Sequence, residues 1–223
     1  MLSVPGAILM PWSHNVSAIL MNFMPGQQAG NAIADVLFGL VNPAAKLPLT
    51  MPNIENETQF TPVQWPGLPN PAEPEYANYT EELLVGYRYY DYHNLTFTSG
   101  FPFGHGLSYT TFSFSGLSVR ASGQALDVTF RVVNSGAVTG QEVAQVYIGF
   151  PTSAGEPPKQ LKGFVKTAPL APGASQVVTL TLQPRAFEVW DVAAHAFVPV
   201  SGMFSLYVGS SSRDIRLKTT FNK

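Results

Sequence analysis

Three pairs of neighbouring acidic residues are the first candidates for chemistry in this sequence. They are Glu55 with Glu57, Glu73 with Glu75, and Glu81 with Glu82. Two carboxylates about 5 to 9.5 Å apart can cleave a glycosidic bond, one protonating the leaving group while the other attacks or activates water. The protonating acid needs apolar surroundings that raise its pKa, but all three pairs lie in polar or proline-rich stretches. The sequence therefore predicts solvated surface carboxylates at these positions.

The histidines offer no alternative chemistry. His14, His93, His105 and His195 are scattered, cysteine is absent, and no pair of ligands has the spacing of a metal site. The sequence also has no Gly-X-Ser-X-Gly elbow and no phosphate-binding glycine loop. We therefore expect no cofactor and no metal. His105, which lies between Gly104 and Gly106, is expected to tie the surrounding backbone through its ring nitrogens.

Composition narrows the class of protein. Of 223 residues 45% are hydrophobic and only 12% are charged, with 19 glycines and 19 prolines, which is typical of a β-rich, loop-rich extracellular protein. The net charge of −2 and the lack of a basic cluster argue against nucleic acid or a membrane surface as a partner. No apolar run reaches 18 residues, so no transmembrane helix is expected.

Four N-X-S/T sequons, at Asn15, Asn56, Asn78 and Asn94, are candidates for N-glycosylation and favour secretion. Residues 1–12 lack the basic and apolar regions of a signal peptide. A glycosylated chain without such a signal leads us to expect that the front of the protein is missing from this sequence.

Residues 1–50 are expected to be the tail of an α/β domain. The apolar run at 16–23 predicts a buried parallel strand, and 25–38 predict a helix whose apolar residues share one face before Gly39. One strand and one helix cannot bury themselves. The segment is therefore expected to be part of a larger domain, or to pack against another subunit.

Residues 51–111 are predicted to form a proline- and aromatic-rich linker. Within it, residues 81–91 place three tyrosines around Arg88, which we expect to stack on a ring or to pair with Asp91. A packing seam is favoured there, and a sugar-stacking platform is the alternative. The linker ends in residues 101–111, here named the clasp, where Gly104 and Gly106 allow tight backbone turns between aromatic residues. Arg88, Asp91, Gly104, His105 and Gly106 are thus assigned structural roles between domains.

Residues 112–223 alternate between apolar and polar side chains, most clearly at 126–132, 178–182 and 204–208. The alternation predicts about seven short strands separated by glycine- and proline-containing turns, which is typical of an antiparallel β-sandwich. The absence of a Cys…Trp…Cys pattern favours the fibronectin type III version. The predicted fold class is mainly β, a fibronectin III-like sandwich preceded by a truncated α/β segment and the linker.

Several motifs in order resemble the C-terminal portion of the family 3 glycoside hydrolases of the β-glucosidase type. They are MPGQQAGNA at 24–32, NPAAKLP at 42–48, VGYRYYD at 85–91, FPFGHGLSY at 101–109, VNSG at 133–136, GQEVAQVY at 140–147 and KQLKGF at 159–164. The resemblance implies a TIM-like barrel, an α/β sandwich domain and a fibronectin III-like domain, with a retaining mechanism. It places the aspartate nucleophile and the glutamate acid/base upstream of residue 1, so no residue of this chain is assigned a catalytic role.

Three hypotheses for function follow. In the first, the chain is part of a secreted β-glucosidase that removes terminal β-D-glucosyl residues, and is inactive alone because it binds its β-glucoside or oligosaccharide only together with the barrel. In the second, it is a glycan-binding module. In the third, it is an assembly subunit that docks on a barrel-bearing chain or forms a homo-oligomer.

Overall fold

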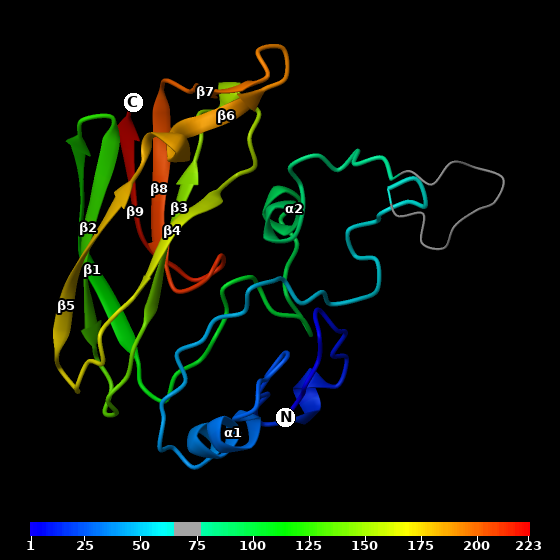
Figure 1. The fold of residues 1–223 in the computed structure, drawn as a ribbon, viewed down its shortest axis with the longest axis vertical. Helices are drawn as coiled ribbons and strands as arrows, with labels where there is room; N and C mark the ends of the chain where they lie inside the picture. The colour runs from blue at the N-terminus through cyan, green and yellow to red at the C-terminus, as the bar shows by residue number, and fades with distance from the viewer. Residues whose placement is uncertain (65–76) are drawn as a thin grey trace.

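The computed structural model describes residues 1–64 and 77–223, with a β-sandwich on one side and loops with two α-helices on the other (Figure 1). Its sandwich begins at residue 112, directly after the clasp. The strands are β1 (Phe112–Ser122), β2 (Ala125–Asn134), β3 (Val143–Gly149), β4 (Gln160–Lys166), β5 (Ser175–Leu182), β6 (Glu188–Asp191), β7 (Ala196–Pro199), β8 (Met203–Gly209) and β9 (Ile215–Asn222).

Two antiparallel sheets form the sandwich. One has the order β1-β2-β5 and the other β4-β3-β8-β9, so that neighbours in sequence do not always pair. Alternate residues of β2, such as Val128, Phe130 and Val132, point into the core, where they meet Val146 of β3 and Leu206 of β8. This alternation is the cause of the fold, because a strand with one apolar face must bury that face against a second sheet. The predicted antiparallel β-sandwich is confirmed.

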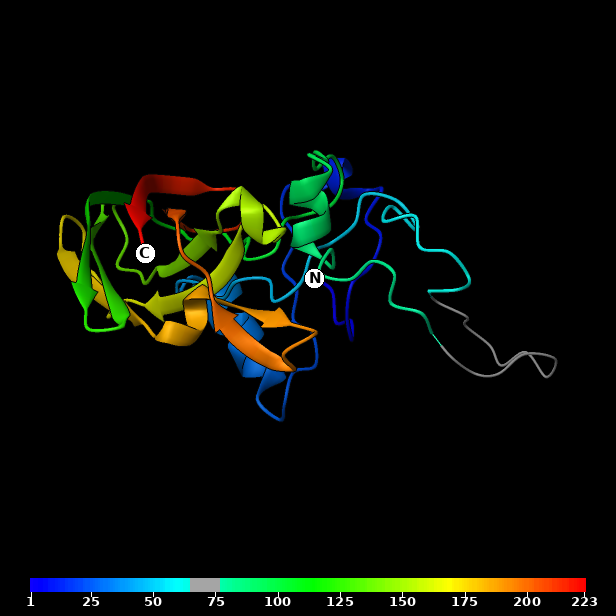
Figure 2. The same cartoon turned by 90° about the horizontal axis from the view of Figure 1, so that it is seen from above.

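The β6–β7 hairpin is the main departure from the predicted strands. Strands β1 to β5, β8 and β9 correspond to the seven that the sequence predicts, whereas β6 and β7 form a separate two-stranded sheet. This hairpin lies at one end of the sandwich (Figure 1) and projects sideways from it (Figure 2). Short 3₁₀ helices complete the sandwich half at Thr152–Ala154 and Pro184–Phe187.

The first 50 residues have less regular structure than the sequence predicts. The expected strand at 16–23 is reduced to one parallel bridge between Leu2 and Met21, flanked by hydrogen bonds of 2.9 Å from Leu2 N to Leu20 O and from Asn22 N to Leu2 O. A strand longer than this needs a neighbour to pair with, and none is present among the described residues. The 3₁₀ helix Ser13–Asn15 lies between the two bridge residues in the chain. The helix α1 (Ala29–Leu37) follows the bridge, and Gly39 (φ 74°) stands just beyond the helix end.

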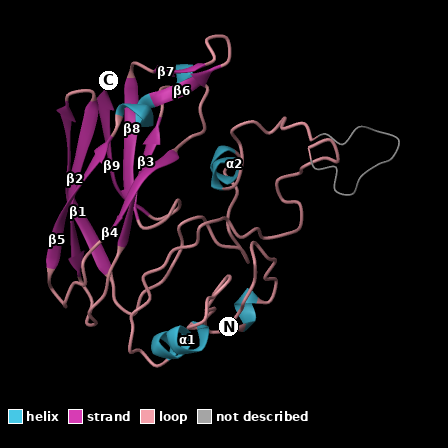
Figure 3. Ribbon diagram, in the orientation of Figure 1, coloured by secondary structure: helices cyan, strands magenta, loops and turns pink. Residues whose placement is uncertain are grey.

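The segment from 51 to 86 is drawn as loop wherever it is described (Figure 3). It is nevertheless tied to the fold, because Met51 is completely buried and pairs in an antiparallel bridge with Phe101. The predicted linker residues 65–76, including Glu73 and Glu75, lie outside the described residues. Helix α2 (Tyr87–Tyr92) follows and lies beside the sandwich. None of the described helices is long and apolar enough to cross a membrane.

Candidate functional site

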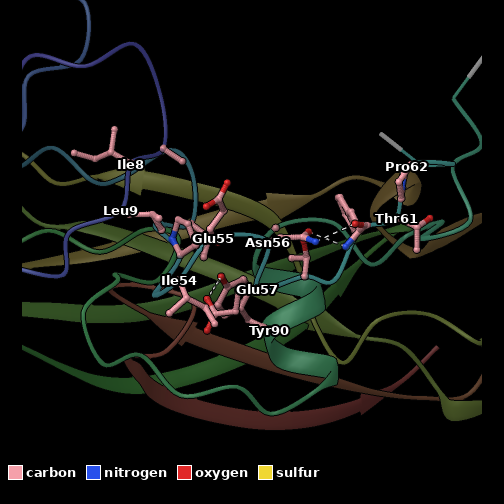
Figure 4. A pocket seen from close by; sticks show the side chains of 15 residues that line it. Ile8, Leu9, Ile54, Glu55, Asn56, Glu57, Thr61, Pro62 and Tyr90 are labelled. Atoms are coloured by element: carbon pink, nitrogen blue, oxygen red, sulfur yellow. Dashed lines mark hydrogen bonds between the residues drawn. The ribbon is translucent and has the colours of Figure 1, made fainter. Parts of the chain in front are cut away.

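An open groove of about 980 Å³ holds one of the predicted acidic pairs (Figure 4). Its walls come from three segments far apart in sequence: residues 7–9, residues 50–62, and α2 with the glycine before it. Ile8, Leu9 and Ile54 give it an apolar side, while Glu55 and Glu57 give it acidic groups.

Glu57 is held by three hydrogen bonds. Asn53 donates its backbone N–H to one carboxylate oxygen at 2.9 Å and its side-chain amide to the other at 2.7 Å. The Tyr90 hydroxyl, from α2, donates a short third bond. Burial by itself would raise the pKa of Glu57, but the hydrogen bonds from Tyr90 and Asn53 outweigh burial and bring the pKa below its ordinary value. Burial and the bond to Glu57 raise the pKa of Tyr90.

These pKa directions fix the chemistry of the pair. At neutral pH Glu57 is ionised and Tyr90 is protonated, so the two form a stable ion–phenol hydrogen bond. A general acid of a glycosidase needs a carboxyl whose pKa is raised toward neutrality, the opposite of what surrounds Glu57. Glu55, two residues away, is exposed. The pair is therefore suited to fixing the loop and not to protonating a leaving group.

Asn53 is the organising residue of this loop, and sequence reasoning did not single it out. It is 8% exposed, and its side-chain oxygen accepts hydrogen bonds from the backbone N–H of Thr98 (2.7 Å), Ser99 (3.2 Å) and Gly100 (3.0 Å). Its amide also donates to Thr96 O at 2.9 Å. An asparagine in a proline-rich stretch carries no periodic signal, so only the folded structure reveals this role.

The third acidic pair makes loop contacts. Glu81 accepts a hydrogen bond of 3.2 Å from the side-chain amide of Gln64, and Glu82 is exposed with a positive φ of 50°. In the described part of the chain, neither Glu81 nor Glu82 shares a hydrogen-bond partner with Glu57. His14, His93 and His195 are exposed, and the described residues contain no group of histidines and carboxylates able to hold a metal ion.

Of the two roles expected for Arg88, the structure shows stacking on a ring and contradicts pairing with Asp91. The Asp91 carboxylate lies 2.5 Å from Lys159 Nζ and 2.9 Å from Arg213 Nε, and its side chain is only 4% exposed. Arg213 also donates to the carbonyl oxygens of Tyr90 and Leu95, each at 2.9 Å. The two cations come from the sandwich, so the ion pairs join α2 to it. The Arg88 guanidinium instead lies 6.0 Å from the Tyr87 ring centroid.

Two of the four tyrosines of α2, Tyr87 and Tyr90, are packed as a seam. Tyr87 stacks on Phe103 with ring centroids 4.9 Å apart, and its hydroxyl accepts the backbone N–H of Leu161 at 2.8 Å. Tyr90 stacks on Phe97 at 5.1 Å. Both tyrosines are buried. Their ring faces are covered by protein, which rules them out as a sugar-stacking platform.

The clasp connects the first 50 residues to the sandwich through backbone hydrogen bonds. Leu47 N donates to His105 O and Gly104 N donates to Leu47 O, both at 2.8 Å. Ser212 N, from the turn after β8, donates to Phe103 O at 3.0 Å. One short segment thus contacts both halves of the protein.

Both clasp glycines stand where a side chain would collide. Gly104 has φ 78°, and a Cβ there would lie 2.3 Å from Gln145 Oε1. A Cβ on Gly106 would lie 2.3 Å from Ala45 O. Lys46 donates to Gly106 O at 3.0 Å and forms an ion pair of 2.9 Å with Glu142. Gly104 thus leaves room for the Gln145 side chain, and Gly106 allows the loop backbone at Ala45 to approach closely.

His105 contributes its ring by stacking and its backbone by hydrogen bonding. Its ring lies against Phe101 with centroids 5.1 Å apart, and its carbonyl oxygen accepts the bond from Leu47. Burial, followed by the nearby charge of Lys46, lowers the pKa of His105. The expected hydrogen bonds from the ring nitrogens are not found within the described part of the chain, which corrects that prediction.

The four sequon asparagines are all exposed, but their side chains differ. The Asn56 amide donates to Phe60 O at 3.0 Å, and its oxygen accepts Phe60 N at 2.9 Å, so the side chain closes its own loop. Asn94 has a positive φ of 52° in the turn after α2. The amide that would carry a glycan is therefore already engaged at Asn56.

Comparison with known proteins adds an independent finding. Residues 1–109 match the Glycosyl hydrolase family 3 C-terminal domain, and residues 142–212 match the Fibronectin type III-like domain. The probable beta-glucosidase D of Aspergillus niger is 38% identical over 227 residues, a match that covers 93% of this chain and 28% of the relative. The thermostable beta-glucosidase B of Acetivibrio thermocellus is 40% identical over 219 residues, covering 94% of this chain and 27% of the relative.

Solved structures agree with the sequence relatives. Beta-glucosidase 3B from Thermotoga neapolitana has a TM-score of 0.87 at 37% identity, covering 99% of this chain and 30% of that protein. DesR, a beta-glucosidase from Streptomyces venezuelae, has a TM-score of 0.89 at 38% identity, covering 97% of this chain and 27% of that protein. The chain thus spans less than a third of the length of these relatives.

Proposed function

We propose that this chain, which belongs to family 3 of the glycoside hydrolases, is the C-terminal part of a secreted, retaining β-glucosidase that removes terminal, non-reducing β-D-glucosyl residues. In this proposal the two catalytic carboxylates belong to parts of the enzyme outside the chain. The chain alone is inactive, and it serves to position and stabilise the rest.

The observation that carries the proposal is the apolar surface around the end of α1. Leu37, Phe38 and Leu40 are 59%, 83% and 77% exposed, and no residue of α1 is buried. Covering three such side chains would contribute on the order of 5 to 9 kcal/mol, at about 1.5 to 3 kcal/mol each. A contiguous apolar surface of this kind marks a protein interface. We infer that the remainder of the enzyme covers it.

The parallel bridge near the start of the chain supports the same conclusion. Leu2 and Met21 pair in parallel, and Met10, which lies between them in the sequence, is completely buried. Parallel strands occur almost only in sheets whose two faces are covered by helices. Further strands and helices packed on residues 1–24 would complete such a layer.

In this proposal the residues of the chain connect the α1 region rigidly to the β-sandwich. Asp91, held by Lys159 and Arg213, fixes α2 to the sandwich, and Glu57 fixes the loop at 53–57 to α2. The clasp holds residues 45–51 against β3 and the turn after β8. Together they join the uncovered α1 region to the sandwich. We propose that the β-sandwich stabilises the α/β domain that carries the catalytic acid.

Complementation tests the proposal. The chain would be co-expressed with the part of the Thermotoga neapolitana enzyme that it does not match, and hydrolysis of an aryl β-glucoside measured. We expect activity only when both parts are present, and we expect Phe38→Asp to abolish co-purification. Val177→Asp is the matched control, because Val177 is 53% exposed on β5, away from α1. Association that survives Phe38→Asp would contradict the role of the α1 surface.

The same apolar surface favours one second candidate, a non-catalytic assembly subunit. In that case the chain would bind a barrel-bearing polypeptide that already possesses its own C-terminal domains. Addition of the chain would then change the oligomeric state of an intact β-glucosidase without being required for its activity. Size-exclusion chromatography with activity assays on the fractions separates the two candidates.

A further inference from the structure

The outward face of the β6–β7 hairpin carries an exposed aromatic pair that the proposed function does not use. Trp190 and Phe197 are directly opposite each other across the hairpin, and they are 50% and 42% exposed. Their ring centroids are 4.9 Å apart with an interplanar angle of 63°. Glu188 and Pro199 form the next pair on this same face, because side chains alternate along a strand. The hairpin projects from the sandwich (Figure 2).

The pair is held in a fixed orientation. The Arg185 guanidinium lies over the Phe197 ring, and its Nη1 is 3.3 Å from Glu188 Oε2. The base of the hairpin is anchored where Val200 N donates to the carbonyl oxygen of the fully buried Phe187 at 3.0 Å. Its tip is closed by Asp191, whose carboxylate accepts Ala194 N at 2.8 Å. An aromatic surface fixed in this way loses little conformational entropy when it binds a ligand.

The size and chemistry of the surface favour a small polyol over a protein. Two large aromatic side chains, each about half exposed, offer roughly 150 to 250 Å² of apolar area. A stable protein interface needs about 800 Å² from each partner, so this surface is several-fold too small. Within the described residues the Trp190 indole N–H has no acceptor, and the Arg185–Glu188 pair adds donors and acceptors at the edge. Arg185 covers one face of Phe197, and the two rings meet edge to face, so the half-exposed Trp190 indole is the surface left for stacking. An exposed indole beside such polar groups matches a sugar ring, which has C–H faces and a rim of hydroxyls.

We propose that Trp190 and Phe197, with Arg185 and Glu188 at their edge, form a binding site for a β-linked glucan chain. A β-glucosyl unit has all its substituents equatorial, so both ring faces are C–H surfaces that stack on an indole. The site lies at the β6–β7 hairpin, and none of its four residues lines the groove at Glu57. The choice of β-linked glucose rests on the proposed function, whereas the stacking geometry does not.

The test is a titration of the isotope-labelled chain with cellopentaose, followed by NMR of the indole N–H signals. The sequence contains three tryptophans, so Trp190→Phe assigns the relevant signal by its disappearance. We expect the Trp190 signal to shift saturably with a millimolar Kd, as a single stacking site would give. Binding measured by calorimetry should be lost in Trp190→Ala and weakened several-fold in Arg185→Ala.

Phe164→Ala is the matched control, since Phe164 is an aromatic residue 67% exposed on β4, and it should bind as the wild type does. The proposal is overturned if cellopentaose moves no tryptophan signal, or if Trp190→Ala binds as well as the wild type. If the Trp190 signal shifts with protein concentration in the absence of sugar, a second copy of the chain occupies the surface and the proposal is overturned. Equal binding of maltopentaose would overturn the assignment to β-linked glucan. Since the assay measures binding without hydrolysis, its failure leaves the proposed activity untouched.

Discussion

Replacing Gly104 by alanine should destabilise the protein more than the same change at a positive-φ glycine whose surroundings are open. Gly104 has φ 78°, and the new Cβ would lie 2.3 Å from Gln145 Oε1. The Gln145 side chain cannot simply swing away. It is 3% exposed, donates to Gly104 O at 3.1 Å and Ser210 O at 2.8 Å, and accepts the Tyr147 hydroxyl at 2.5 Å.

Two effects set the size of the loss. The left-handed conformation costs an L-residue about 1 to 2 kcal/mol. Moving the Gln145 amide breaks three hydrogen bonds, each contributing about 0.5 to 1.5 kcal/mol, or about 3 kcal/mol together. Gly155→Ala provides the control, because Gly155 has φ 66° with no atom within 4 Å of a Cβ. The Gly155→Ala variant therefore has only the free-energy cost of the left-handed backbone conformation, without a collision.

Thermal unfolding followed by circular dichroism measures the difference. The extra 3 kcal/mol should lower the Tm of Gly104→Ala by roughly 6 to 12 °C more than that of Gly155→Ala. In a Gln145→Ala background the extra loss should disappear, since the collision partner is gone. Equal shifts for the two glycine variants would refute the close approach of the clasp to β3.

Further predictions follow from the other contacts. Asp91→Asn should lower stability by about 3 to 5 kcal/mol in urea unfolding, because its two cations lose a buried partner; an unchanged midpoint would contradict the ion pairs. Glu57 has a folded pKa below its ordinary 4.5, so its stabilising contribution is present above that pH and lost as the pH falls through the folded pKa. The Tm of the wild type should therefore fall more steeply than that of Glu57→Gln over this acidic range. Peptide mass spectrometry after secretory expression should find a glycan at Asn94 and none at Asn56; a fully occupied Asn56 would contradict its closed loop.

The sandwich could be predicted because its signal is local and repeated. In β2, Val128, Phe130 and Val132 alternate with polar neighbours, and other strands of the sandwich have the same pattern. In each strand the alternation indicates that one face is buried. The β6–β7 hairpin escaped prediction because its strands have only four residues each. Two residues per face are too few to distinguish period two from irregular loop.

Long-range polar contacts could not be predicted. Asp91 and Arg88 are three residues apart, a spacing at which side chains on a helix meet, so local pairing was one of the two roles expected for Arg88. The actual partners, Lys159 and Arg213, are 68 and 122 residues further along the chain and lie near Asp91 only because of the tertiary fold. Asn53 is a similar case, since its role depends on residues 96–100 folding back over it.

The tyrosines of α2 and the acidic pair Glu55 and Glu57 also show that side-chain contacts cannot be read from the sequence. Three tyrosines in four residues allowed both a packing seam and a sugar platform, and only burial distinguishes them. The sequence predicted solvated carboxylates at Glu55 and Glu57, which is right for the exposed Glu55 and wrong for the half-buried Glu57. The hydrogen bonds of Glu57 to Tyr90 and Asn53 required the fold.

The most direct test of the central claim is the hydrolysis of an aryl β-glucoside by purified chain 1–223 on its own. The account predicts a rate equal to that of buffer, because Glu57 is ionised and held by three donors. A rate above buffer that Glu57→Gln abolishes would contradict it, since the catalytic acid would then lie within this chain.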